Sequence, residues 1–325
     1  MKKTLVLLGT LFMMTLLFAQ EEVTIYTYDS MGWINDKVVT QFEKENNCKV
    51  KVVKFSSTGN IVARLKMEKK HNKADLVIGV TPVMLNALKK EDLLVSYKSK
   101  FIKNIKEKEI IFDNEFYVTP YDYGAIAIVY NPENMKSIPK NFKDLTKLKK
   151  KLIIEDPRTS TTGQDFLLWT IAVYGENWEQ YWKELKPAIL TVAPGWSEAF
   201  SKFEAGEAPM MVSYGTDGAY SYQYYKSTKY KALIPDDGGF IEVEGVGIVN
   251  GSKNIELSKK FIDFMLGNKF QKEIPLNQWM FPVTNIKLPE SFKYAVSPKK
   301  VVLVSGEEIS KNMKKWLGKW EKIME

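Results

Sequence analysis

The sequence contains few of the side chains that build disulfides, metal sites and nucleophilic active sites. Among its 325 residues there is one cysteine, Cys48, and one histidine, His71. A single cysteine excludes an intrachain disulfide, and one cysteine with one histidine excludes a Cys–His metal site. Cys48 precedes a predicted strand and has no histidine beside it to act as a base, so it does not look like a nucleophile. We therefore expect no metal site and no catalytic residue.

Long hydrophobic runs are confined to the N-terminus. Lys2 and Lys3 form a short basic start, Thr4–Phe18 is almost wholly apolar, and Ala19 precedes the polar Gln20. This is the pattern of a secretory signal peptide. After it, no segment reaches the run of about 18 apolar residues that a membrane-spanning helix needs. The pattern predicts a signal peptide over residues 1–19 and a periplasmic or other extracytoplasmic location.

An excess of positive charge is present but not concentrated. The 47 Lys and Arg residues against 39 Asp and Glu residues give a net charge of +8, which falls to +6 without Lys2 and Lys3. The lysines are scattered over the faces of predicted helices, as in Lys147–Lys151. Such lysines are typical of solvated surface, so we expect no nucleic-acid partner.

Strands and helices alternate from the start of the mature chain. Val23–Tyr28, Lys49–Phe55 and Ala74–Gly79 read as strands, and Asp36–Glu45 and Ile61–Lys69 between them as amphipathic helices. This order predicts an α/β fold with a mostly parallel sheet flanked by helices. In such sheets, ligands gather at the loops that follow the carboxyl ends of the strands.

The chain is long enough for two lobes. A mature chain of roughly 300 residues exceeds one typical core. Ala125–Tyr130 looks like a strand that passes into a second lobe, and Phe240–Val249 looks like the return. We expect a first lobe of residues 20–124 plus 246–325, a second lobe of residues 125–245, and two crossover strands that act as a hinge.

The segment around Ser160 has the pattern of an anion site. A β-branched strand stops at Asp156-Pro157, and Ser160, Thr161 and Gly163 then lead into an apolar helical run. Ser and Thr favour the N-cap of a helix, whose free N–H groups and positive dipole end attract phosphate or carboxylate. Ordinary N-capping explains the same residues without a ligand.

Aromatic and hydroxyl side chains gather in four other short stretches. Each places a Trp or Tyr beside small residues at a strand end or helix start, where its ring would face a cleft. Aromatic faces attract cations and stack on flat heterocycles. Taken alone, each ring is better explained by a place in the core, so only their joint appearance indicates a binding site. The stretches are Tyr26–Ser30 with Trp33, Gly195–Glu198, Ser213–Asp217 with Tyr220, and Asn277–Pro282.

Together these stretches resemble the periplasmic thiamine-binding proteins of ABC importers over nearly the whole mature chain. The resemblance implies a two-lobed periplasmic binding protein of the type II-like fold, with thiamine, and also thiamine monophosphate and diphosphate, enclosed between the lobes. It further implies delivery to a membrane permease, no cofactor, and action as a monomer. The motifs are YTYDS (Tyr26–Ser30), RLKMEKKHNKAD (Arg64–Asp75), PYDYG (Pro120–Gly124), VYN (Val129–Asn131), EDPRTSTTG (Glu155–Gly163), LLWT (Leu167–Thr170), GWSEAF (Gly195–Phe200), SYGTDGAY (Ser213–Tyr220) and NQWMFPV (Asn277–Val283).

The resemblance also implies which residues contact the ligand. Ser160 and Thr161 match its phosphate side. Ser57 and Thr58 occupy the matching loop of the other lobe, where the family carries an acidic residue and a glycine. Gly215 and Asp217 match by position only. The full implied set is Tyr28, Ser57, Thr58, Ser160, Thr161, Trp196, Tyr214, Gly215, Thr216, Asp217, Tyr220 and Trp279, with Trp33 and Asp122 as weaker candidates.

Three alternatives remain open at this point. Ferric-ion-binding proteins share this fold, and Tyr224-Tyr225 resembles their paired tyrosine ligands, although that pair belongs where Tyr214-Gly215 stand. A binder of another small solute, such as a polyamine or a different phosphorylated heterocycle, fits the same pattern. A thiamine-degrading enzyme of related fold would use a cysteine nucleophile, for which Cys48 is the one candidate.

Overall fold

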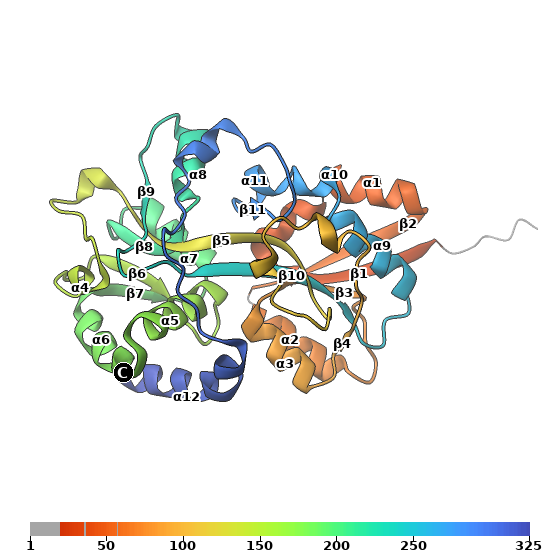
Figure 1. Ribbon diagram of the computed structural model, residues 1–325, viewed down its shortest axis with the longest axis horizontal. Coiled ribbons are helices and arrows are strands. Elements are labelled where there is room, and N and C mark those ends of the chain that lie inside the picture. The colour runs from red at the N-terminus through yellow and green to blue at the C-terminus, as the bar shows by residue number, and fades with distance from the viewer. Residues whose placement is uncertain (1–19, 36, 57) are drawn as a thin grey trace, which may run out of the picture.

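The computed structural model describes residues 20–35, 37–56 and 58–325 and contains two lobes side by side (Figure 1). The predicted signal peptide and Ser57 lie outside the described residues. The elements of the first lobe are β1 (Glu21–Tyr28), α1 (Lys37–Asn46), β2 (Cys48–Phe55), α2 (Thr58–Glu68), β3 (Leu76–Val80), α3 (Pro82–Lys90), β4 (Leu94–Val95), α9 (Ile255–Met265), α10 (Asn268–Gln271), α11 (Ile274–Asn277) and β11 (Phe281–Pro282).

The second lobe repeats the same alternation of strands and helices, as Figure 1 shows. Its elements are α4 (Phe142–Leu145), β6 (Leu152–Glu155), α5 (Thr161–Tyr174), α6 (Trp178–Leu185), β7 (Ile189–Ala193), α7 (Trp196–Glu204), β8 (Met210–Tyr214), α8 (Asp217–Tyr225) and β9 (Lys231–Leu233).

Two long strands, β5 (Thr119–Tyr130) and β10 (Ile241–Val249), connect the lobes. β5 pairs with β10 and β11 in its first half and with β8 and β9 in its second half. Within the first lobe β1 is parallel to β2 and β3, and within the second lobe β6 is parallel to β7 and β8. The predicted α/β fold with mostly parallel sheets and two crossover strands is therefore confirmed.

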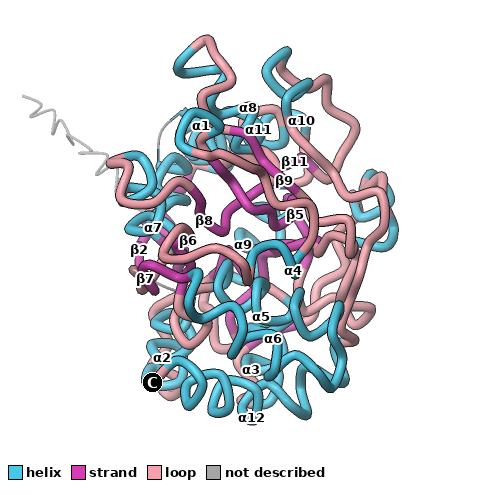
Figure 2. Tube along the Cα trace, turned by 90° about the vertical axis from the view of Figure 1, so that its left-hand side faces the viewer, coloured by secondary structure: helices cyan, strands magenta, loops and turns pink. Residues whose placement is uncertain are grey.

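Helices cover the sheets on both faces. Figure 2 shows the strands in the middle of the molecule, with helices and loops outside. The fully buried strands β3 (LVIGV) and β6 (LIIE) explain this arrangement, because a strand that is apolar on both faces must be covered on both. No helix among residues 20–35, 37–56 and 58–325 has the length and apolar character needed to cross a bilayer.

The last helix corrects one expectation. Helix α12 (Gly306–Met324) lies along α6 and α3, as both figures show, and it buries Trp316 and Trp320 in the core that also contains Trp182. The Trp182 and Trp320 rings meet edge to face at 5.8 Å between centroids. The assignment of all of residues 246–325 to the first lobe is therefore wrong for this helix, because its apolar stripe completes the core of the second lobe.

Candidate functional site

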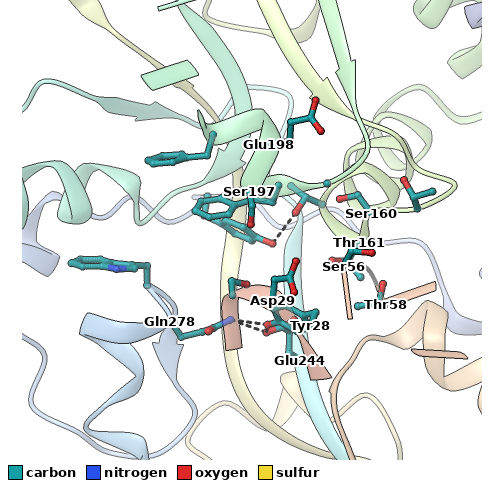
Figure 3. Close-up of a pocket in the computed structure, with 18 of the residues that line it drawn as sticks. Tyr28, Asp29, Ser56, Thr58, Ser160, Thr161, Ser197, Glu198, Glu244 and Gln278 are labelled. Atoms are coloured by element: carbon teal, nitrogen blue, oxygen red, sulfur yellow. Dashed lines mark hydrogen bonds between the residues drawn. The ribbon is translucent and has the colours of Figure 1, made fainter. Parts of the chain in front are cut away.

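A cavity of about 520 Å³ lies between the lobes where the crossover strands meet them. Its wall combines hydroxyl, carboxylate and aromatic side chains from both lobes (Figure 3). The lining residues are Tyr28, Asp29, Ser30, Ser56, Thr58, Asn60, Thr159, Ser160, Thr161, Thr162, Pro194, Gly195, Trp196, Ser197, Glu198, Phe200, Tyr214, Tyr220, Glu244, Asn277, Gln278, Trp279 and Met280.

The predicted anion motif forms one end of this cavity. The chain leaves β6, turns at Asp156, and enters α5 with Ser160 as N-cap; the Ser160 hydroxyl oxygen accepts from the Gly163 N–H at 3.4 Å. A Cβ at Gly163 would lie 2.6 Å from the Glu155 carbonyl oxygen, so only glycine lets α5 begin this close to the strand. Arg158 is turned away and bonds Asp156 and Glu321. The other first-turn N–H groups of α5 have no carbonyl partner within the helix and lie at this end of the cavity.

Two more helices begin at the same cavity. Helix α2 starts at Thr58 in the first lobe and α7 starts at Trp196 in the second, after Gly195. The two lobes approach closely here, since a Cβ at Gly195 would lie 3.9 Å from the Ser56 carbonyl oxygen. Figure 3 shows Ser160, Ser56 and Thr58 on one side of the cavity. Three positive helix ends and several hydroxyls suit an anionic group at this side.

Aromatic rings from both lobes form another part of the wall. Trp196 stacks on Phe200, with ring centroids 4.9 Å apart, and donates its indole N–H to the Ser213 hydroxyl at 2.8 Å. Tyr220 of α8 meets Trp279 of the first lobe edge to face at 5.2 Å. Trp279 adopts a left-handed backbone conformation, with φ of 59°, that non-glycine residues rarely occupy. Its ring therefore reaches across the cleft at some cost in backbone energy.

Tyr28 forms the floor beside the crossover strand β10. A Cβ at Gly79, which has φ of +90°, would lie 2.2 Å from the Tyr28 ring, so glycine makes room for it. The Tyr28 hydroxyl donates to Glu244 Oε2 at 2.5 Å, and Gln278 Nε2 donates to the Tyr28 oxygen at 2.7 Å. The Trp33 indole in turn donates to Gln278 Oε1 at 2.8 Å. This network, drawn in part in Figure 3, fixes the Tyr28 ring in place.

Buried carboxyl groups accompany these tyrosines on the crossover strands. Glu242 and Glu244 lie two residues apart on β10, and hence on the same face; Asp122 of β5 and Asp165 of α5 lie beside them. Burial raises the pKa of Glu242 to about 8. Burial, and then repulsion from neighbouring carboxylates, raises the pKa of Asp122 and of Asp165 well above the ordinary range. At neutral pH this cluster therefore retains protons.

The charge of the lining favours a cation. Asp29, Glu198 and Glu244 line the cavity, whereas no Lys, Arg or His appears among its described lining residues. Carboxylates and electron-rich ring faces both attract positive charge. The cavity thus offers negative groups and rings to a cationic heterocycle, and backbone N–H and hydroxyl donors to an anionic tail.

Most residues expected from the sequence line this cavity. The structure places at its wall Tyr28, Thr58, Ser160, Thr161, Trp196, Tyr214, Tyr220 and Trp279. Ser57 lies outside the described residues. The weaker candidates are one step removed: Trp33 acts on the wall through Gln278, and Asp122 is fully buried behind Glu244.

Gly215, Thr216 and Asp217 are not brought to the cavity. The C-terminal segment covers Gly215, because the Val296 N–H donates to the Gly215 carbonyl at 2.8 Å and a Cβ at Gly215 would lie 2.3 Å from the Val296 oxygen. Thr216 and Asp217 are buried. Asp217 is buried, which raises its pKa to about 7, and the Ser213 hydroxyl that stabilises its ionised form also holds Trp196. Asp217 therefore supports a wall residue from behind.

Sequence reasoning did not select every lining residue within the motifs that it recognised. Gln278 lies beside Trp279 in one motif, and Ser197 and Glu198 follow Trp196 in another, so position within a motif was the available signal. Glu244 had a clearer one. Strand β10 reads IEVEGVGIV, and two glutamates at alternate positions of an otherwise apolar buried strand indicate a polar role for that face.

The side chains on which the enzyme and ferric-ion alternatives depend do not line the cavity. Cys48 is fully buried among apolar residues at the start of β2, and burial raises the pKa of its thiol. A nucleophilic cysteine needs the opposite shift. Tyr224 and Tyr225 lie on α8 with exposed side chains; Tyr225 donates to Glu204 and Tyr224 packs near Trp279. Neither tyrosine is among the residues that line the cavity.

The chain belongs to the bacterial extracellular solute-binding protein family, which it matches over residues 27–272. Among curated proteins it is similar to a thiamine-binding periplasmic protein of Brucella melitensis, with 37% identity over 310 residues, 93% of this chain and 92% of that protein.

The chain is also similar to proteins of solved structure. The structure of a periplasmic thiamin binding protein has a TM-score of 0.88 and 32% identity, and the match covers 94% of this chain and 97% of that one. A ferric binding protein from Campylobacter jejuni has a TM-score of 0.79 at 21% identity, covering 93% and 99% of the two chains, and shares the fold.

Proposed function

We propose that this protein is an extracytoplasmic solute-binding protein that captures thiamine between its two lobes. The observation that carries the proposal is the division of the cavity wall. Trp196, Tyr220 and Trp279 with the Glu244 carboxylate suit the flat cationic ring system of thiamine, and the α5 start at Ser160 suits its hydroxyethyl arm or a phosphate on it. The similarity to proteins named thiamine-binding supports the same ligand.

We extend the proposal to thiamine monophosphate and diphosphate, and to delivery of the ligand to an ABC permease by a monomeric, non-enzymatic carrier. The helix starts at Thr58, Ser160 and Trp196 support the phosphate forms, because backbone N–H groups supply donors where the described lining carries no basic side chain. The apolar run before Ala19, and the periplasmic relatives, support export by a signal peptide over residues 1–19.

Calorimetric titration with thiamine, its monophosphate and its diphosphate tests the ligand. We expect dissociation constants in the nanomolar range, about −12 kcal/mol, because several rings and polar groups act together. If none of the three binds more tightly than about 10 µM, roughly −7 kcal/mol, the thiamine proposal is wrong and only the fold remains.

Two controls address the other ligand classes. Titration with ferric ion, followed by absorbance, should give no tyrosinate charge-transfer band, since Tyr224 and Tyr225 lie away from the cavity lining. A polyamine such as putrescine should not displace thiamine, because it lacks the flat ring that the aromatic wall fits.

A separate test addresses catalysis. Thiamine incubated with the protein should be recovered unchanged, whereas turnover would make the protein an enzyme.

A further inference from the structure

One carboxylate of the cavity wall differs from the others in burial. Asp29 and Glu198 also line the cavity, but both are exposed, and Glu198 pairs with Lys202. Glu244 is only 4% exposed, yet still contributes to the wall. Water and salt screen an exposed charge strongly and a buried one much less. Among these lining carboxylates, Glu244 therefore acts most strongly on the cavity.

Hydrogen bonds favour the ionised form of Glu244. Its Oε2 accepts from Tyr28 at 2.5 Å, from Tyr121 at 2.9 Å and from Gln278 at 3.4 Å. Such donors favour the ionised carboxylate. Burial raises the pKa of Glu244 as well, but these hydrogen bonds oppose that rise, whereas the pKa of Asp122 beside it is raised well above the ordinary range. Of this pair, Glu244 is the carboxyl group whose ionised form the hydrogen bonds favour.

The second glutamate of β10 provides a contrast. Glu242 has the same strand face and a similar burial, and it accepts from Tyr214 at 2.5 Å. It does not belong to the cavity wall, Asp165 lies beside it, and its pKa of about 8 keeps it protonated at neutral pH. Of the two glutamates, Glu244 is the one at the cavity wall, and its Oε2 accepts from three donors.

We propose that Glu244 determines the selectivity of the cavity for a cationic heterocycle over a neutral one of the same shape. This inference rests on the proposed binding of thiamine and deepens it. Glu244 acts in two ways: its charge attracts the cationic ring directly, and its hydrogen bond to Tyr28 makes that phenol ring, which lines the wall, a better partner for a cation. A neutral ring gains little from either effect.

The test compares thiamine with 3-deazathiamine, whose ring keeps the shape of the thiazolium but carries no charge. Both are titrated into the wild-type protein and into Glu244→Gln at pH 7.5. Glutamine keeps the size of the side chain and an oxygen that accepts from Tyr28 and Tyr121. We expect Glu244→Gln to weaken thiamine binding by about tenfold or more, as loss of a weakly screened charge near a cation requires. The affinity for 3-deazathiamine should change by less than about threefold, so that the preference for thiamine shrinks by the same tenfold.

Glu242→Gln is the matched control, because it alters the same face of β10 two residues away. It should leave the ratio of the two affinities unchanged. Melting of the ligand-free variants reports folding, and Glu244→Asp provides a second, charged variant that should keep the preference for the cation if Glu244→Gln proves unstable. Equal losses for both ligands, or an unchanged preference in Glu244→Gln, would overturn the inference. Absence of thiamine binding by the wild-type protein would instead overturn the proposed function.

Discussion

Replacing Ser160 by alanine should separate the phosphorylated ligands from thiamine itself. Ser160 is buried at the cavity wall, and its hydroxyl oxygen caps α5 through a long 3.4 Å bond from the Gly163 N–H. The hydroxyl proton is then free to point to a phosphate oxygen. A hydrogen bond to a charged group contributes about 1.5–3 kcal/mol, so Ser160→Ala should weaken diphosphate binding roughly tenfold to 150-fold. Thiamine, which has no phosphate, should lose less than about threefold.

Calorimetric titration of all three ligands measures this difference, with Thr159→Val as the control. Thr159 also lines the cavity, but its hydroxyl donates to the Pro194 carbonyl at 2.7 Å and is not available to a ligand. Thr161→Val should have the smaller phosphate effect, because the Thr161 hydroxyl is hydrogen-bonded to Glu242. Equal losses for thiamine and its phosphates in Ser160→Ala would mean that the motif serves only as a helix cap.

Three further outcomes follow from the structure. Trp279→Ala and Trp279→Gly should each weaken thiamine binding by about 1–3 kcal/mol, because both lose the ring. The glycine variant should have a free energy of unfolding roughly 1 kcal/mol higher than the alanine variant, because a φ of 59° suits glycine. Equal free energies of unfolding would argue against backbone strain. Asp217→Asn should stabilise the protein at pH 8 by up to about 4 kcal/mol but little at pH 4. The buried carboxyl group has a pKa of about 7 in the folded state and about 4 in the unfolded state, so the wild-type protein loses stability as the pH rises from about 4 to 7. Identical urea midpoints of variant and wild type at pH 8 would refute this. Thiamine should reduce the radius of gyration in solution scattering, because Tyr28 and Trp196 approach one ligand from different lobes, and an unchanged radius would exclude lobe closure.

Local patterns predicted the elements that carry the site. The hydroxyl run after Asp156-Pro157 predicted a helix start near Ser160, and α5 begins at Thr161 with Ser160 as its cap. This succeeded because capping depends on residues within one turn, which the sequence presents in order. The aromatic residues Trp196, Tyr220 and Trp279 were recognised for a similar reason, since each follows a strand end or turn whose loops face the cleft in such folds.

In two places the sequence-based expectation was wrong because it depended on contacts between segments distant in the chain. Gly215 and Asp217 follow strand β8 as a ligand loop should, but Val296, from a segment some eighty residues later, covers Gly215, and Asp217 is buried. Helix α12 has an apolar stripe that the sequence reveals, but nothing in the stripe says which lobe it completes. Hydrophobic burial has no direction, so periodicity identifies a buried face without its partner.

By itself, the sequence determined the alternation of strands and helices, the two crossover strands, the helix start at Ser160 and the aromatic residues of the wall, because each depends on neighbours in the chain. Only the tertiary structure decided that Glu244 faces the cavity while Glu242, two residues earlier, does not. Both glutamates satisfy the same pattern on β10, and their protonation depends on Tyr28, Tyr121 and the other carboxyl groups that folding brings together. Burial and electrostatic coupling are properties of that packed arrangement, which no local pattern contains.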